Sequence, residues 1–129
     1  MTLFSKIIVG QIPSYFIKED ELFYAFLDVF PLVPGHVLVV PKIEIDKLYN
    51  LPQPYLAALL AFAQPIALAI EKTMPCKRCG FSVIGLEVPH AHLHVVPINT
   101  ADDLNFTRPK LTLPASQMNL IRETIVAAL

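Results

Sequence analysis

Three histidines that alternate with apolar residues constrain this chain more than any other stretch of it. His90, His92 and His94 lie within Val88–Pro97, and an apolar residue follows each of them. A β-strand has a side-chain period of two, so a strand here would place the three imidazoles on one face and the apolar residues on the other, towards a core. The motif therefore predicts a half-buried strand with a chemically active face.

Two kinds of site use imidazoles in this arrangement. In the first, one imidazole attacks a phosphorus atom while the others position it, since an imidazole with a pKa near ~6.5 is largely neutral at pH 7. In the second, the same face binds zinc or copper, for which imidazole is a common ligand. A surface strand without a role is the weakest interpretation, because three imidazoles in strict alternation are a poor choice for packing.

The other elements predicted from the sequence fit one α+β domain over residues 1–129. A chain of 129 residues suits a single core. Hydrophobic patterns and turn residues predict short strands at 15–18, 22–29, 37–41 and 81–84, a short turn or helix at 4–10, and a terminal helix at 114–129. The apolar run inside Pro52–Thr73 predicts a long helix, which Pro65 should kink.

Composition limits the partners that this chain can have. Apolar residues make up 54% of it, charged residues make up 16%, and the net charge is −1 without a basic run. We therefore expect no nucleic-acid partner bound through phosphate contacts. The apolar stretch Leu56–Ile70 is shorter than the ~20 residues that span a bilayer, so a buried helix is expected and no membrane partner. Without a recognisable secretory signal at Met1–Gly10, a cytoplasmic protein is expected.

Four segments of the chain resemble the signature sequences of the histidine triad (HIT) family. His90–Val96 fits the family's His-φ-His-φ-His-φ-φ, with φ apolar, at every position. Phe4–Pro13 looks like the opening of bacterial members, and Ala25–Pro31 is similar to the family's Ala-Phe-x-Asp-Ile-x-Pro. Pro34–Lys42 resembles its Pro-Gly-His-x-Leu-Val-x-Pro-Lys. All four histidines of the chain fall where the family places functional histidines.

The resemblance implies a HIT-like fold, with an antiparallel sheet, one long kinked helix, a C-terminal helix and a homodimer joined through a continuous sheet. It implies a nucleotide hydrolase or nucleotidyl transferase that acts at the α-phosphate of a phosphoramidate, a dinucleoside polyphosphate or a similar compound. The substrate would be a purine nucleotide of the adenosine type, and no cofactor is implied. A nucleotide-binding regulatory module without catalysis, and a metal-binding protein that uses His-x-His-x-His, remain alternative functions.

The resemblance also implies a role for each site residue. His92 would attack the α-phosphate to give a nucleotidyl-histidine that water then hydrolyses, and His90 would orient it by packing and hydrogen bonding. His94 and His36 would line the phosphate site, and Asp28 would accept hydrogen bonds from the ribose hydroxyls. The base pocket would be formed by the apolar residues Phe4, Ile12, Phe26, Val29 and Leu38.

Several positions depart from the family pattern. Ser5 replaces a cysteine of the zinc-binding members, and Glu44 lies near the position of one of their histidines, so we expect no structural zinc. Glu87 lies before the histidine motif, where members usually carry a polar donor. Cys76 and Cys79 are expected to be free thiols without an essential role, because a zinc site would need two further ligands.

The long helix also predicts an oligomer. It is apolar nearly all round, whereas a lone domain of this length can cover only one of its faces. We expect a homodimer that buries the other face, with Leu59, Phe62 and Ile66 in either the core or the interface.

Overall fold

Five antiparallel strands form one sheet in the order β1-β2-β3-β5-β4. In the computed structural model, which describes residues 1–129, the strands are β1 Phe16–Glu19, β2 Phe23–Leu27, β3 Val37–Pro41, β4 Arg78–Ser82 and β5 Leu93–Ile98. The predicted α+β architecture and the antiparallel sheet are confirmed. The strands at the two edges of the sheet are β1 and β4.

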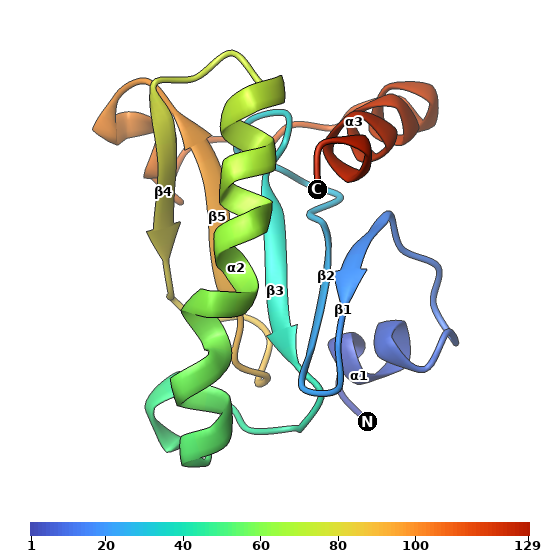
Figure 1. The fold of residues 1–129 in the computed structure, drawn as a ribbon, viewed down its shortest axis with the longest axis vertical. Coiled ribbons are helices and arrows are strands. Elements are labelled where there is room, and N and C mark those ends of the chain that lie inside the picture. Colours follow the sequence, from blue (N-terminus) through green and yellow to red (C-terminus); the bar gives the residue numbers. More distant parts are fainter.

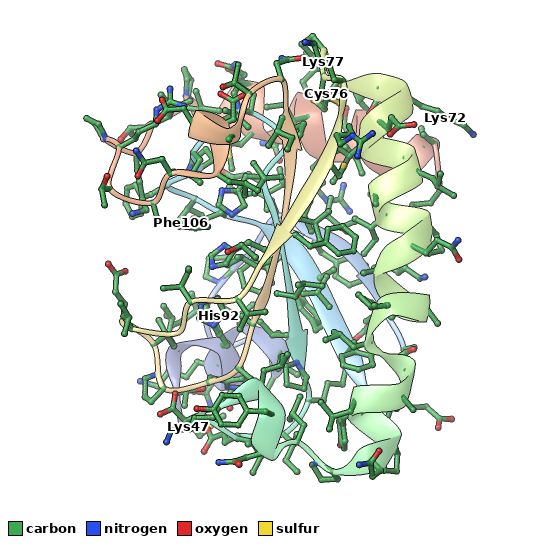
Figure 2. The ribbon with its side chains drawn as sticks, turned by 90° about the vertical axis from the view of Figure 1, so that its left-hand side faces the viewer. Lys47, Lys72, Cys76, Lys77, His92 and Phe106 are labelled. Carbon is green, nitrogen blue, oxygen red and sulfur yellow. The ribbon has the colours of Figure 1, made fainter.

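Three helices accompany the sheet: α1 Leu3–Ile8, α2 Gln53–Thr73 and α3 Ala115–Ala127. Helix α2 lies lengthwise over one face of the sheet (Figure 1). The turned view places α2 on one side of the sheet and α1 on the other (Figure 2). Pro65 lies inside α2, and the helix continues past it to Thr73. Two short 3-10 turns, Leu48–Asn50 and Ala101–Leu104, complete the regular structure.

Strand β3 is buried on both faces, and this explains its unbroken apolar sequence. Val37 and Val39 belong to the main core, with residues from α2 and α3. Leu38 and Val40 belong to a second cluster, with Phe4 and other residues of α1. Because successive side chains of a strand point to opposite faces, a central strand covered on both sides is apolar at every position. The prediction of a central strand at 37–41 is therefore confirmed.

Two predicted strands begin several residues away from their starts in the structure. The strand predicted at 81–84 is β4, which begins at Arg78 and pairs with β5 through Gly80 and Val96. Gly80 makes room in β4, since a Cβ atom at this position would collide with the side chain of Leu104. The strand predicted at 88–97 was also wrong at its start, because β5 begins at Leu93 and leaves His90 and His92 in an irregular segment before it.

A tight turn before β3 brings His36 to the site. Gly35 has a φ of 96° in this turn, a conformation that a side chain disfavours. A Cβ atom at Gly35 would also lie 2.8 Å from Met74 Cγ. The Pro-Gly-His sequence is thus a structural requirement for placing this histidine at the start of β3.

The apolar helix α2 is half covered. Leu59, Phe62 and Ile66, which the sequence left between core and interface, all lie in the main core. Leu60 and Leu68, by contrast, are 60% and 55% exposed. By length and composition alone this 21-residue helix could cross a membrane, so the argument from a short apolar run does not hold for the observed helix. Its buried face packs on the sheet.

Candidate functional site

A cavity of about 630 Å³ opens on the face of the sheet opposite α2. His92 and Phe106 lie on this side of the molecule (Figure 2). Most of the residues expected to form the nucleotide site line the cavity: Phe4, Ile12, Phe26, Asp28, Val29, Leu38, His92 and His94. Two expected residues are not among the lining: His36 is buried behind His94, and His90 is fully buried.

The main chain fixes the imidazole of His92. Its Nδ1 donates a hydrogen bond of 2.7 Å to the carbonyl oxygen of His90. A carbonyl oxygen only accepts, so the proton of neutral His92 lies on Nδ1 and the lone pair of Nε2 is free. The edge of Phe4 packs against this ring, with 5.0 Å between the ring centroids. His92 therefore has the tautomer that a nucleophile or a base requires.

His36 and His94 form a directional hydrogen-bond relay. The N–H of Leu32 donates to His36 Nδ1 at 3.1 Å, so the proton of His36 lies on Nε2. His36 Nε2 lies 2.9 Å from His94 Nδ1 and donates to it, which places the proton of His94 on its own Nε2. His94 lines the cavity, so this geometry leaves it an N–H group that no protein acceptor takes up. His36, which was expected to line the phosphate site, lies behind His94 and donates a hydrogen bond to it.

Asp28 combines a turn with a place in the cavity wall. Its Oδ1 accepts the N–H of Phe30 at 2.9 Å, as an aspartate in a turn often does. Its Oδ2 lies 3.7 Å from His36 Nε2, and the side chain is 18% exposed. Burial raises the pKa of this carboxyl, while the Phe30 N–H and the charge of Lys110 oppose the shift. The local turn leaves Oδ2 available to hydroxyl groups.

An apolar slot adjoins these polar groups. Phe4 and Phe26 pack edge to face at 5.7 Å, and Leu38 belongs to the same buried cluster. Val29 is half exposed at the rim of the cavity. A planar, largely apolar group fits such a slot through burial and stacking.

The sequence missed two residues of the site. Phe106 packs its ring against His94, with centroids 4.5 Å apart, and against His36. Lys110 is the only lysine or arginine of the cavity wall. Its positive charge is opposite in sign to the carboxylates of Asp28 and Glu87 in the same wall. Both lie in the irregular segment between Leu104 and Ala115, where the sequence has no repeating hydrophobic pattern. No local signal therefore identified them.

The three histidines of the motif do not form a metal site. His90 Nε2 donates to the carbonyl oxygen of Pro41 at 2.8 Å, and its Nδ1 lies 2.7 Å from Thr2 Oγ1. The group whose ligand atoms do converge is Asp28, His36 and His94, within 4.8 Å of one another. The facing nitrogens of those two imidazoles, however, are already hydrogen-bonded to each other. The geometry favours hydrogen bonding over metal ligation.

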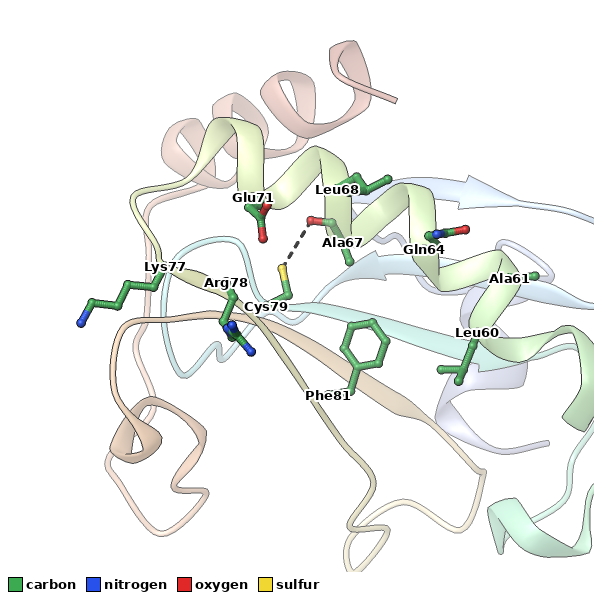
Figure 3. A pocket seen from close by; sticks show the side chains of 10 residues that line it. All are labelled: Leu60, Ala61, Gln64, Ala67, Leu68, Glu71, Lys77, Arg78, Cys79 and Phe81. Atoms are coloured by element: carbon green, nitrogen blue, oxygen red, sulfur yellow. Dashed lines mark hydrogen bonds between the residues drawn. The ribbon is translucent and has the colours of Figure 1, made fainter.

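The two cysteines lie away from this cavity. Both are free thiols. Cys79 donates to the carbonyl oxygen of Ala67 at 3.4 Å, in a groove between α2 and β4 (Figure 3). Burial is the largest cause that raises the pKa of this thiol to about 12, so it is a poor nucleophile at neutral pH.

Burial of the relay makes the stability of the fold depend on pH. Burial is the main cause that lowers the pKa of His36 and of His94 from 6.5 to about 3. Between these values the unfolded chain binds more protons than the folded chain, so stability is full above pH 6.5 and is lost as the pH falls towards 3. We expect the free energy of unfolding, measured in urea, to fall by more than ~1.4 kcal/mol, the equivalent of one pKa unit, between pH 7 and pH 5. In a double variant, His36→Leu with His94→Leu, the free energy of unfolding should change less between pH 7 and pH 5. An unchanged pH dependence would contradict the assignment of this effect to the two buried histidines.

Comparison with known proteins points to one family. The family model described as HIT domain matches residues 9–101. An uncharacterised HIT-like protein of Borreliella burgdorferi is 34% identical over 113 residues, which cover 82% of this chain and 81% of that protein. The adenosine 5'-monophosphoramidase HNT1 of Saccharomyces cerevisiae is 34% identical over 96 residues, which cover 74% of this chain but only 61% of that enzyme.

A solved structure extends the similarity over the whole fold. The Hit-like protein of Bartonella henselae, described as involved in cell-cycle regulation, superposes with a TM-score of 0.85 at 28% sequence identity. The match covers 99% of this chain and 96% of that one.

Proposed function

The chain belongs to the HIT domain family, and we propose that it is a nucleotide hydrolase that acts through His92. The observation that carries this proposal is the hydrogen bond from His92 Nδ1 to the His90 carbonyl, which leaves Nε2 unprotonated at the cavity wall. A neutral imidazole nitrogen is a competent nucleophile towards phosphorus.

In the proposed reaction, the lone pair of His92 Nε2 attacks the α-phosphorus of a nucleoside phosphate derivative. The bond between phosphorus and the leaving group breaks, and the leaving group departs with that electron pair and takes up a proton. Water then attacks the same phosphorus and gives up a proton, which balances the proton taken up by the leaving group. The phosphorus–nitrogen bond breaks, its electron pair returns to His92 Nε2, and a nucleoside monophosphate leaves. One displacement becomes two, as in other covalent catalysis.

The groups around His92 suit the charge of such a reaction. His94 has an Nε2–H to donate to a phosphate oxygen, and this donor is set by the relay from His36. Lys110 supplies a positive charge in the cavity wall. A preorganised donor stabilises the charge that develops on the phosphate oxygens.

The nucleoside part would occupy the apolar slot. We propose that the base lies among Phe4, Ile12, Phe26, Val29 and Leu38, which all line the cavity. Asp28 Oδ2 would accept hydrogen bonds from the ribose hydroxyls. Of the candidate substrates, an adenosine phosphoramidate has the support of a relative's name, since the Saccharomyces cerevisiae and Candida albicans relatives are adenosine 5'-monophosphoramidases.

The experiment that tests this function uses adenosine 5'-monophosphoramidate and the dinucleoside polyphosphate of adenosine in parallel. We expect release of AMP and ammonia from the first, and quenching in an alkaline denaturant, in which a phosphorus–nitrogen bond persists, should trap a protein carrying one covalent AMP. Binding of AMP without turnover of either compound would instead indicate a nucleotide-binding module.

We also propose that a second copy of the chain covers the exposed face of α2. A groove of about 790 Å³ separates this face from β4, and Leu60, Leu68 and Phe81 are among the residues that line it (Figure 3). These three side chains are 60%, 55% and 43% exposed. Strand β4 is also an edge strand, whose unpaired backbone can continue the sheet into a partner. A two-fold dimer would bury both features on each copy.

A charged residue in this groove is expected to dissociate the dimer. Leu68→Glu would place a carboxylate in a desolvated interface, so its mass by light scattering should fall from two chains to one. Leu120→Glu is the matched control, because Leu120 is 62% exposed on α3, outside the groove, and should leave the mass unchanged. A wild-type mass of one chain at micromolar concentration would contradict the dimer.

A further inference from the structure

The role of His90 is not explained by contact with the cavity. Its side chain is fully buried and is absent from the cavity wall, unlike those of His92 and His94. What reaches His92 from this residue is its main-chain carbonyl, which accepts the Nδ1–H of His92 at 2.7 Å. The direct hydrogen bond between the two residues is therefore made by the backbone of His90 and not by its ring.

Both nitrogens of this ring are held by groups from distant parts of the chain. Nε2 lies 2.8 Å from the carbonyl oxygen of Pro41, at the end of β3, and must carry the proton because a carbonyl cannot donate. Burial, the largest cause, lowers the pKa of His90 and favours the neutral ring. Nδ1 of the neutral ring is then an acceptor, and the hydroxyl of Thr2, 2.7 Å away, is its donor.

Thr2 is itself held from several directions. Its Oγ1 accepts the N–H of Ser5 at 3.1 Å and so caps α1, the helix that carries Phe4. Its backbone N–H donates to Glu44 Oε1 at 2.8 Å. The Ser5 side chain donates to Glu44, and this contact is the first cause that lowers the pKa of that carboxyl.

These contacts form one continuous series of hydrogen bonds from the surface to His92. Glu44 and the backbone N–H of Ser5 hold Thr2, Thr2 and Pro41 hold the ring of His90, and the carbonyl of His90 holds the ring of His92. Phe4 closes the arrangement, since its ring packs against His90 at 5.7 Å and against His92 at 5.0 Å.

We propose that Thr2, supported by Glu44, is a positioning residue that sets the tautomer of His92 through His90. The inference rests on the proposed function, in which His92 is the nucleophile. The hydroxyl of Thr2 is the one group near His90 Nδ1 that can donate to it, so its loss leaves a buried acceptor unpaired. The His90 ring and backbone then have room to shift, and the bond that keeps His92 Nε2 unprotonated weakens.

The test compares Thr2→Val, which replaces the hydroxyl by a methyl group of similar shape, with Thr2→Ser, which keeps the hydroxyl. Nitrogen-15 NMR of the imidazoles reads the tautomers without any substrate. We expect wild type and Thr2→Ser to hold the His92 proton on Nδ1, and Thr2→Val to show a mixture of the two tautomers. A His92 tautomer that is unchanged in Thr2→Val would overturn the proposal.

Turnover of adenosine 5'-monophosphoramidate is the second measurement. In Thr2→Val, kcat should fall about tenfold with KM within about twofold of wild type, since a misplaced group impairs the chemical step more than binding. Thr2→Ser should restore kcat, and a kcat in Thr2→Val within twofold of wild type would overturn the proposal. A wild-type protein without turnover would refute the proposed function, while the NMR comparison would still decide the role of Thr2.

Glu44 provides a variant that does not depend on how well Thr2→Val folds. Its side chain is largely exposed, so Glu44→Ala should leave the core intact. It removes the acceptor of the Thr2 N–H, and we expect the same change in the His92 tautomers at smaller amplitude. A Glu44→Ala spectrum identical to that of wild type would count against the support that Glu44 gives to Thr2.

Discussion

His92→Ala is expected to abolish turnover while the protein remains folded. Loss of a nucleophile costs several orders of magnitude in other enzymes, so kcat should fall by on the order of 10⁴-fold or more. The side chain lines a cavity instead of filling the core, and thermal unfolding should therefore show a transition close to that of wild type. Single-turnover kinetics with adenosine 5'-monophosphoramidate, together with the mass of protein quenched in an alkaline denaturant, measure both the rate and the covalent adduct.

The matched control for this prediction is His92→Asn. An asparagine amide can still donate to the carbonyl of His90, as His92 Nδ1 does, but it offers no nucleophilic nitrogen. Both variants should therefore lack the adduct and lose activity to a similar extent. An adduct that persists in either variant, or a rate within tenfold of wild type, would exclude His92 as the nucleophile.

His94→Leu should produce the second largest loss. The proposed donor to the phosphate is His94 Nε2–H, and removal of one such donor lowers kcat by about 10²–10³-fold in other enzymes. Leucine fills much of the same volume beside Phe106, so the loss should appear in kcat more than in stability. The burst of adduct formation should slow by the same factor.

His94→Gln separates the donor from the shape of the ring. The glutamine amide nitrogen can lie near the position of imidazole Nε2 and can donate to the same phosphate oxygen. We expect the kcat of His94→Gln to be at least about tenfold higher than that of His94→Leu. Equal activity in the two variants would mean that His94 contributes packing and no hydrogen bond to the reaction.

Much of the fold could be predicted from local patterns. The unbroken apolar run of β3 indicated a central strand, and the helical spacing of apolar residues indicated α2, since each pattern reports how many faces of an element are covered. The predicted edges of β4 and β5 were wrong, because they depend on register. The position of Gly80 in β4 has no room for a side chain because Leu104 packs against it, and β5 begins at Leu93, where its pairing with β3 begins.

The residues of the candidate site were also largely found from sequence, whereas their arrangement was not. The motif identified the histidines, and the segments around Phe4, Asp28 and His36 identified six further residues of the cavity wall. Phe106 and Lys110 were missed, because a loop without a repeating pattern carries no signal for what it will contact.

The amino-acid sequence by itself determined the residue types of the site and the faces of its main elements, because alternation and helical spacing act over a few neighbouring residues. Only the tertiary structure decided which groups hold the rings of His90 and His94, because those partners are distant in the chain. The ring of His90 meets groups 49 and 88 residues away, and His36 meets His94 across 58 residues. Such contacts exist only once the sheet has formed, and they give these buried imidazoles their hydrogen-bond partners.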